Sequence, residues 1–225
     1  MDEARDGTLP AIECKRENMR EFSQADQSAL IGAGLTLLRS AGARPINAFR
    51  AGNYGLNTAT LAALAEIGID FDTSYNAAAD IGVDDVAPGQ ILTQPRRFNT
   101  VMENTVTVYR DRGGDSMRLF QLNACSFSEI TRILTTAVDN GWESVVMVSH
   151  NFELLNRRKN RPDPIVVRRF RKLCRYMDRN RDRFEVAGFT GPQKPGEHLQ
   201  PAPFASSRWE TYGRSAEQLA RRAFG

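Results

Sequence analysis

The segment INAFRAGNYGLNTATLAALAEIGIDFDTS, residues 46–74, predicts a strand, a helix and a second strand in direct succession. Residues 46–49 and 69–72 are short apolar runs of strand type. Between them, Asn57 or the residue after it can cap a helix whose leucines recur at helical spacing, and Gly68 can end that helix. A strand, helix and strand joined in this way form the βαβ unit of a parallel sheet or barrel.

The same alternation continues on both sides of this unit. Further helices are expected at residues 23–41, 126–138, 164–179 and 215–224. Further strands are expected at residues 100–109, 116–122, 144–149 and 184–186. The run 144–149 is the most apolar of these and predicts a buried strand. Helices and strands thus alternate along most of the chain, which predicts the α/β class.

The composition is that of an ordinary globular protein. Of the 225 residues, 41% are hydrophobic and 25% are charged. The longest apolar runs, such as 144–149, are far too short to span a bilayer. No apolar segment follows the polar start at residues 1–6, and the three cysteines (Cys14, Cys125 and Cys174) do not have the pattern of a disulfide framework. We therefore expect a cytoplasmic protein without a membrane span.

The positive charge of the chain is concentrated in one segment. Residues 157–183 hold twelve Lys or Arg against three Asp, a net charge of +9, whereas the rest of the chain carries −6. Such a field could attract an anionic glycan, a nucleic acid or a lipid surface, and the alternative is a solvated helix face. No aromatic interleaving or base-reading motif accompanies the charge, so a nucleic-acid partner is disfavoured.

Three predicted strands end in polar residues. Arg50 follows the strand at 46–49, Asp70 and Asp72 end the second strand, and His150 follows the run 144–149. In βα architectures the carboxyl ends of the strands meet at one rim, where function collects. An Arg, an Asp and a His at such a rim could do acid–base chemistry, with the Asp orienting the His and the Arg holding an anion. The structural alternatives are a rim ion pair, a turn cap and a hydrogen-bonded histidine.

Several of these segments together resemble one known family, the polysaccharide deacetylases of the NodB-like type. The segments that carry the resemblance are FRAGNYG at 49–55, TLxxL at 60–64, IGIDFDTS at 67–74, MVSH at 147–150, and GTLP at 7–10 with Glu13 and Lys15. The resemblance implies a partial, distorted (β/α) barrel of the glycoside hydrolase and deacetylase type over residues 8–190. A Pro-rich tail with a short C-terminal helix is expected at 191–225.

The resemblance also implies an activity, the hydrolysis of N-acetyl groups on an acetylated carbohydrate. In that family a divalent metal, usually zinc, and a catalytic Asp activate water. By motif position, Arg50 matches the arginine that positions the catalytic base, and Tyr54 matches the aromatic residue beside the oxyanion, with Asn53 next to it in the substrate-binding loop. Asp72 matches the carboxylate that tunes the general acid, and His150 matches that acid, which protonates the leaving amine.

The family's metal-binding motifs are the main departure. Its Asp-Asp pair and its two metal-binding histidines have no counterpart before Arg50, and the chain contains only His150 and His198. Because a zinc site needs about three protein ligands, no metal ligand is assigned from this sequence. The first hypothesis is therefore the carboxyl-terminal part of a carbohydrate deacetylase, either a piece of a longer enzyme or a chain that repairs an open sheet edge by self-association. The alternative hypothesis is a non-catalytic, glycan- or polyanion-binding remnant of the fold.

Overall fold

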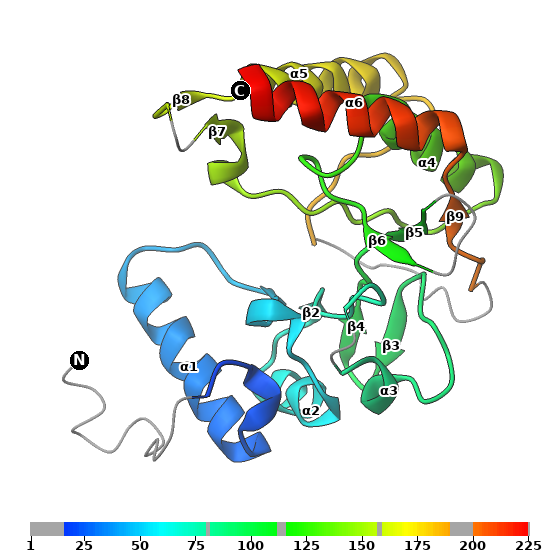
Figure 1. Ribbon diagram of the computed structural model, residues 1–225. Coiled ribbons are helices and arrows are strands. Elements are labelled where there is room, and N and C mark those ends of the chain that lie inside the picture. Colours follow the sequence, from blue (N-terminus) through cyan, green and yellow to red (C-terminus); the bar gives the residue numbers. More distant parts are fainter. Residues whose placement is uncertain (1–15, 80–81, 112–115, 157–158, 190–199, 225) are drawn as a thin grey trace.

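The structure is a computed structural model that describes residues 16–79, 82–111, 116–156, 159–189 and 200–224. Its elements fall into two regions along the chain (Figure 1). The first region extends to Glu103 and forms the lower part of the view, and the second region follows it and forms the upper part. Helices and strands occur in both regions, so the predicted mixed α/β class is confirmed.

The first region is built around one small sheet. Its helical elements are η1 (Met19–Glu21), α1 (Gln24–Ser40), η2 (Gly52–Tyr54), α2 (Thr58–Glu66) and α3 (Val83–Val86). Its strands are β1 (Ala48–Phe49), β2 (Phe71–Asp72), β3 (Arg96–Phe98) and β4 (Val101–Glu103). The strand order is β1-β2-β4-β3, in which β1, β2 and β4 are parallel and β3 is antiparallel to β4. The predicted βαβ unit is confirmed, with α2 joining β1 to β2.

Local sequence explains where α2 begins and ends. The Asn57 side chain accepts a hydrogen bond from the Thr60 amide at 2.9 Å, and the Thr60 hydroxyl accepts one from the Asn57 amide at 3.1 Å. This reciprocal pair is a capping box, which satisfies amides that the first turn leaves free. Gly68 ends the connection with a φ of 75°, a conformation that glycine adopts without strain.

The core of the first region consists of Ile31, Leu35, Leu56, Leu61, Leu64, Ile69, Tyr75, Val86, Ala87, Leu92 and Val101.

The second region packs three helices against a second small sheet. Its helical elements are α4 (Phe127–Asp139), η3 (Asn151–Leu154), α5 (Pro164–Arg179) and α6 (Arg208–Phe224). Its strands are β5 (Val108–Arg110), β6 (Met117–Leu119), β7 (Leu155–Asn156), β8 (Arg161–Pro162) and β9 (Phe204–Ala205). The sheet has the order β6-β5-β9, while β7 and β8 form a separate antiparallel pair. The core consists of Tyr109, Phe120, Leu122, Cys125, Ile130, Ile133, Leu134, Val166 and Phe204.

Buried arginine contacts attach α6 to the rest of the second region. Arg214 donates from Nη2 to both carboxylate oxygens of Asp111, at 2.9 and 2.8 Å, and from Nη1 to the carboxylate of Glu129. Arg169 of α5 pairs with Glu217 of α6 at 2.5 Å. The C-terminal helix is therefore held by buried ion pairs.

Several predicted elements differ from the structure. The expected strand at 100–109 is two strands, β4 and β5, which belong to different sheets. The run 144–149 makes only one isolated bridge, between Val148 and Gln121, and residues 184–186 are not a strand. The last helix begins at Arg208, two turns before the predicted start. Its first turns were missed because the residues that it buries, such as Arg214, are polar.

The described helices were also compared with what a bilayer requires. None of those within the described residues is long and apolar enough to cross a membrane. Among the cysteines, Cys125 is a buried thiol and Cys174 is an exposed thiol, while Cys14 lies outside the described residues. Most of the Pro-rich segment, residues 190–199, also lies outside them.

Candidate functional site

The loop that follows β1 has a strained backbone. Asn53 and Tyr54 both have positive φ values, 53° and 58°, although neither is a glycine. The left-handed conformation costs roughly 1–2 kcal/mol for such a residue, and strain of this kind gathers at functional sites. Asn53 is exposed and Tyr54 is half-buried. The loop therefore presents both residues that the sequence predicts for substrate binding.

Two hydrogen bonds fix this loop to the end of β2. Arg50 donates from Nε to the carbonyl oxygen of Thr73 at 3.2 Å, which leaves the rest of its guanidinium exposed. The Ala51 amide donates to the Ser74 hydroxyl at 2.8 Å. Because Ser74 in turn donates to Asp72 at 2.6 Å, the position of the loop depends on the Asp72 carboxyl group.

Two carboxyl groups lie side by side, fully buried, at the ends of β2 and β4. Asp72 and Glu103 are partners in the parallel register, and their buried carboxyl groups interact electrostatically. Glu103 also accepts a hydrogen bond from the Tyr75 amide at 3.1 Å. Burial raises the pKa of both carboxyl groups, and the charge of Asp72 raises the pKa of Glu103 further. Glu103 therefore retains its proton to a higher pH than an exposed carboxyl group would.

His150 lies in a second group of polar residues, next to η3. Its Nδ1 atom is 2.9 Å from Oε1 of Glu153, and the Gln121 amide donates to the same oxygen. Glu153 is buried, whereas the imidazole of His150 is half-exposed. The Phe152 ring stacks on the imidazole with 4.8 Å between ring centroids. Glu153 is thus placed to orient the imidazole.

Tyr54 connects the two groups of residues electrostatically. Burial raises the pKa of its phenol, the positive charge of Arg50 opposes that rise, and the negative charge of Glu153 adds to it. Both Arg50 and Glu153 therefore lie within electrostatic range of the Tyr54 ring. On the basis of this electrostatic link, we take the strand-end arginine, the strained loop and the His150–Glu153 pair together as one candidate site.

The predicted residues occupy this site to different degrees. Arg50 and Tyr54 lie on the loop after β1 and His150 lies beside Glu153, and the meeting of all three at one rim stays a prediction. Asp72 makes its described contacts with Ser74 and Glu103, whereas His150 makes its contact with Glu153. The role of Asp72 in tuning His150 therefore stays a prediction.

Sequence reasoning missed Glu103, Gln121 and Glu153. Glu153 follows His150 by three residues, and that spacing within a turn is the one local signal that pointed to it. The other two lie far from their partners in sequence, so only the fold brings them together.

The described residues do not fit a zinc site. Among them, no group of three His, Cys, Asp or Glu side chains could hold a metal ion. His150 already uses Nδ1 for Glu153, and the carboxyl groups of Asp72 and Glu103 are fully buried. His198 lies outside the described residues.

Comparisons of the chain with family models, curated proteins and solved structures found no match. The contacts within the chain are therefore the basis for a functional assignment, together with the motifs quoted above.

Proposed function

We propose that this chain carries the substrate-binding and proton-donating side of a carbohydrate deacetylase site. The observation that supports it best is the electrostatic influence of Arg50 and Glu153 on Tyr54, because Arg50, Tyr54 and His150, the hydrogen-bond partner of Glu153, match the motifs of the polysaccharide deacetylase family. On this proposal β1, β2 and β4 are consecutive strands of a partial, distorted (β/α) barrel. The substrate is an acetylated carbohydrate.

The proposed reaction is the hydrolysis of an N-acetyl amide. Water adds to the carbonyl carbon, the C–N bond breaks, acetate leaves, and the sugar nitrogen takes up a proton. His150 supplies that proton from Nε2, because Glu153 holds the Nδ1 side of the ring at 2.9 Å. Protonation turns the leaving nitrogen into an amine, which leaves far more easily than an amide anion.

Tyr54 and Arg50 act on the carbonyl oxygen and on the acetate product. Burial raises the pKa of Tyr54, so its phenol keeps its proton at neutral pH and can donate a hydrogen bond to the developing oxyanion. Arg50 contributes a positive charge at the same rim and can hold the carboxylate that leaves. Asn53, the exposed polar residue directly before Tyr54, binds sugar hydroxyls.

A second function, glycan binding without hydrolysis, is favoured by one observation. Water activation in the family depends on zinc, and the described residues hold no cluster of metal-ligating side chains. The same loop and histidine would then bind the N-acetyl group without cleaving it. The two functions share a ligand and differ in the product, which makes them separable by experiment.

The test uses the full chain and a chitin tetrasaccharide in two forms, N-acetylated and de-N-acetylated. Saturation-transfer NMR reports binding of the acetyl methyl group, and proton NMR reports free acetate with and without added Zn²⁺. We expect selective binding of the acetylated form, weakened about tenfold in Tyr54→Phe because a hydrogen bond is lost. Tyr212→Phe, a change at an exposed tyrosine of α6, is the matched control.

The outcomes separate the functions. Acetate release that His150→Ala reduces by about a hundredfold or more supports the deacetylase. Selective binding without acetate supports the non-catalytic function. Equal or absent binding of the two oligosaccharides overturns both. Sedimentation of the same sample tests self-association, for which β1 is the proposed site because it is an edge strand of its sheet.

A further inference from the structure

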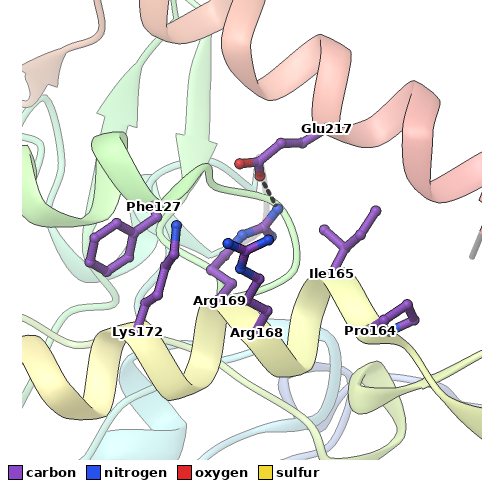
Figure 2. A pocket seen from close by; sticks show the side chains of 7 residues that line it. All are labelled: Phe127, Pro164, Ile165, Arg168, Arg169, Lys172 and Glu217. Atoms are coloured by element: carbon purple, nitrogen blue, oxygen red, sulfur yellow. Dashed lines mark hydrogen bonds and ion pairs between the residues drawn. The ribbon is translucent and has the colours of Figure 1, made fainter.

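A hollow of about 380 Å³ lies between α5 and α6, beside the first turn of α4 (Figure 2). It is lined by Phe127, Pro164, Ile165, Arg168, Arg169, Lys172 and Glu217. A second hollow of about 280 Å³ shares Phe127 and Lys172 with the first and adds Arg175, Tyr176 and Arg179. The two hollows form one continuous depression along α5, which we call the α5 groove.

Four cationic side chains follow the α5 groove in a single row. Arg168, Lys172, Arg175 and Arg179 are spaced four, three and four residues apart, which places them on one face of the helix. All four are exposed. With a rise of 1.5 Å per residue, the row is about 16 Å long. Figure 2 shows the Arg168 guanidinium and the Lys172 ammonium directed to the same side of α5, toward the space below α6.

The charge of this row is not neutralised within the described part of the chain. There, Arg168, Arg175 and Arg179 have no acidic partner, and the Lys172 ammonium lies 5.3 Å from the centre of the Phe127 ring. Among the described residues that line the groove, Glu217 is the only acidic one, and it is paired with Arg169 at 2.5 Å. By contrast, Arg181 and Arg183 at the end of α5 pair with Asp178 and Asp139.

Arg169 differs from its neighbours because it is structural. It is buried, and besides its pair with Glu217 it donates from Nη1 to the carbonyl oxygen of Leu122 at 2.8 Å. The groove therefore keeps a net positive charge from the four exposed cations, while the one carboxylate is already bonded. A row of this length suits several negative groups along an extended chain better than one compact anion.

We propose that the α5 groove binds an acidic polysaccharide. The charge and the shape call for an extended polyanion, and the choice of a carbohydrate rests on the proposed function. The aromatic residues of the groove argue against single-stranded nucleic acid, which stacks its bases on open rings. Phe127 and Tyr176 meet edge to face at 6.3 Å, and Lys172 covers Phe127, so these rings are already engaged.

The test measures binding of a galacturonate oligomer to the full chain by calorimetry at about 50 and about 300 mM salt. We expect binding that weakens with salt, and that weakens about tenfold or more in the double variant Arg168→Glu/Arg175→Glu. The neutral variant Arg168→Ala/Arg175→Ala should show a smaller loss in the same direction. Both pairs of side chains are exposed, so the variants should fold, which their thermal unfolding would verify.

The matched control is Arg39→Glu/Arg44→Glu. It makes the same change in net charge at two exposed residues of the first region, away from α5. We expect its affinity to stay within about twofold of the unchanged chain, since screened charges at long range contribute little. An equal loss in this control would mean that net charge alone drives binding, and would overturn the proposal.

Two further outcomes decide the ligand. Single-stranded DNA of matched charge that displaces the galacturonate oligomer completely and binds more tightly would overturn the assignment to a polysaccharide. Failure of the proposed function is distinguishable, because Tyr54→Phe and His150→Ala should leave galacturonate binding unchanged. If the galacturonate oligomer binds through Arg168 and Arg175 while the acetylated oligosaccharide does not bind, the proposal for the α5 groove is supported and the proposed deacetylase site is not.

Discussion

The two regions of the molecule bury acidic groups in opposite ways. In the first region, the carboxyl groups of Asp72 and Glu103 are fully buried and interact with each other. In the second region, buried or half-buried carboxylates face arginines, as Asp111 faces Arg214 and Asp163 faces Arg221. The first arrangement is stable when a proton is present, and the second when the carboxylates are charged.

This difference predicts opposite responses to pH. Burial raises the pKa values of Asp72 and Glu103, so their contribution to stability is complete below about pH 4 and is lost as pH rises through the raised values. Although burial opposes it, hydrogen bonding from Arg214 lowers the pKa of Asp111. The contribution of Asp111 is therefore complete above about pH 4 and is lost as pH falls through the lowered value.

The largest expected effect comes from removing Arg214. Arg214→Ala leaves Glu129, which is fully buried, without its cation, and should lower the free energy of unfolding by about 3–5 kcal/mol. Urea unfolding measures the loss, and hydrogen exchange locates it. We expect the amides of β5 and α6 to lose protection while those of α2 keep theirs.

The exposed pair of Arg181 and Asp178 provides the control for this prediction. Arg181→Ala removes an arginine from a solvent-exposed ion pair and should change stability by less than about 1 kcal/mol. Equal loss of protection in α2 and α6 of the Arg214→Ala variant would contradict the comparison. The two regions would then unfold as a single cooperative unit.

A smaller effect, of the opposite sign, is expected at Glu103. Glu103→Gln keeps an oxygen for the Tyr75 amide and offers an amide donor to Asp72, while it removes one ionisable group from a buried site. We expect the free energy of unfolding to rise by about 1 kcal/mol at pH 8 and to change little at pH 4, where Glu103 is already neutral.

The mirror variant sharpens the comparison. Asp111→Asn should destabilise the protein at pH 7 because it removes the charge that Arg214 faces, and its effect should shrink below about pH 4. Thermal unfolding of both variants between about pH 2 and about pH 8 gives the two slopes. Slopes of the same sign would contradict the inferred difference, namely that the carboxyl pair of the first region and the arginine-paired carboxylate of the second region depend on pH in opposite directions.

The smallest expected effects concern the two capping boxes, one in each region. Asn57→Ala and Ser126→Ala should each cost about 1 kcal/mol, because each leaves helix amides without a partner. The cost at Asn57 should be the larger, since its side-chain oxygen also accepts from Gln27 at 3.2 Å. Urea unfolding compares them. A cost near zero at Asn57 would mean that packing alone holds α2 in place.

The first region was largely predictable from sequence, and the second was not. The βαβ unit has local signals, namely an Asn57 cap, apolar residues at helical spacing and Gly68 at the end. The start of α6 has no comparable signal, because Arg214 and Thr211 occupy its buried face and count as solvent-exposed in a hydrophobic pattern. Residues 100–109 were predicted as a single strand because the residues typical of strands continue through the segment where the chain passes from one sheet to the other.

The candidate site was predictable in part for a related reason. Arg50, Tyr54 and His150 were found because short motifs surround them in the sequence. Glu103 was missed because its importance comes from its neighbour across the sheet, Asp72, which only the register reveals. The same holds for the α5 groove. The basic segment is visible in the sequence, but which of its cations pair with carboxylates is not. In the sequence, Arg169 cannot be distinguished from its neighbour Arg168, and only the structure shows that Arg169 is buried.

The pairing of β5 with β9, and of Asp111 with Arg214, has a consequence for synthesis on the ribosome. These last two residues are 103 positions apart in sequence. At ~5–20 residues per second, Arg214 emerges about 5–20 s after Asp111. The first region can complete its sheet and core during that interval, whereas the second has an unpaired strand edge and hydrated acids. Nascent chains should therefore need protection from aggregation at this stage, with folding completed when α6 arrives.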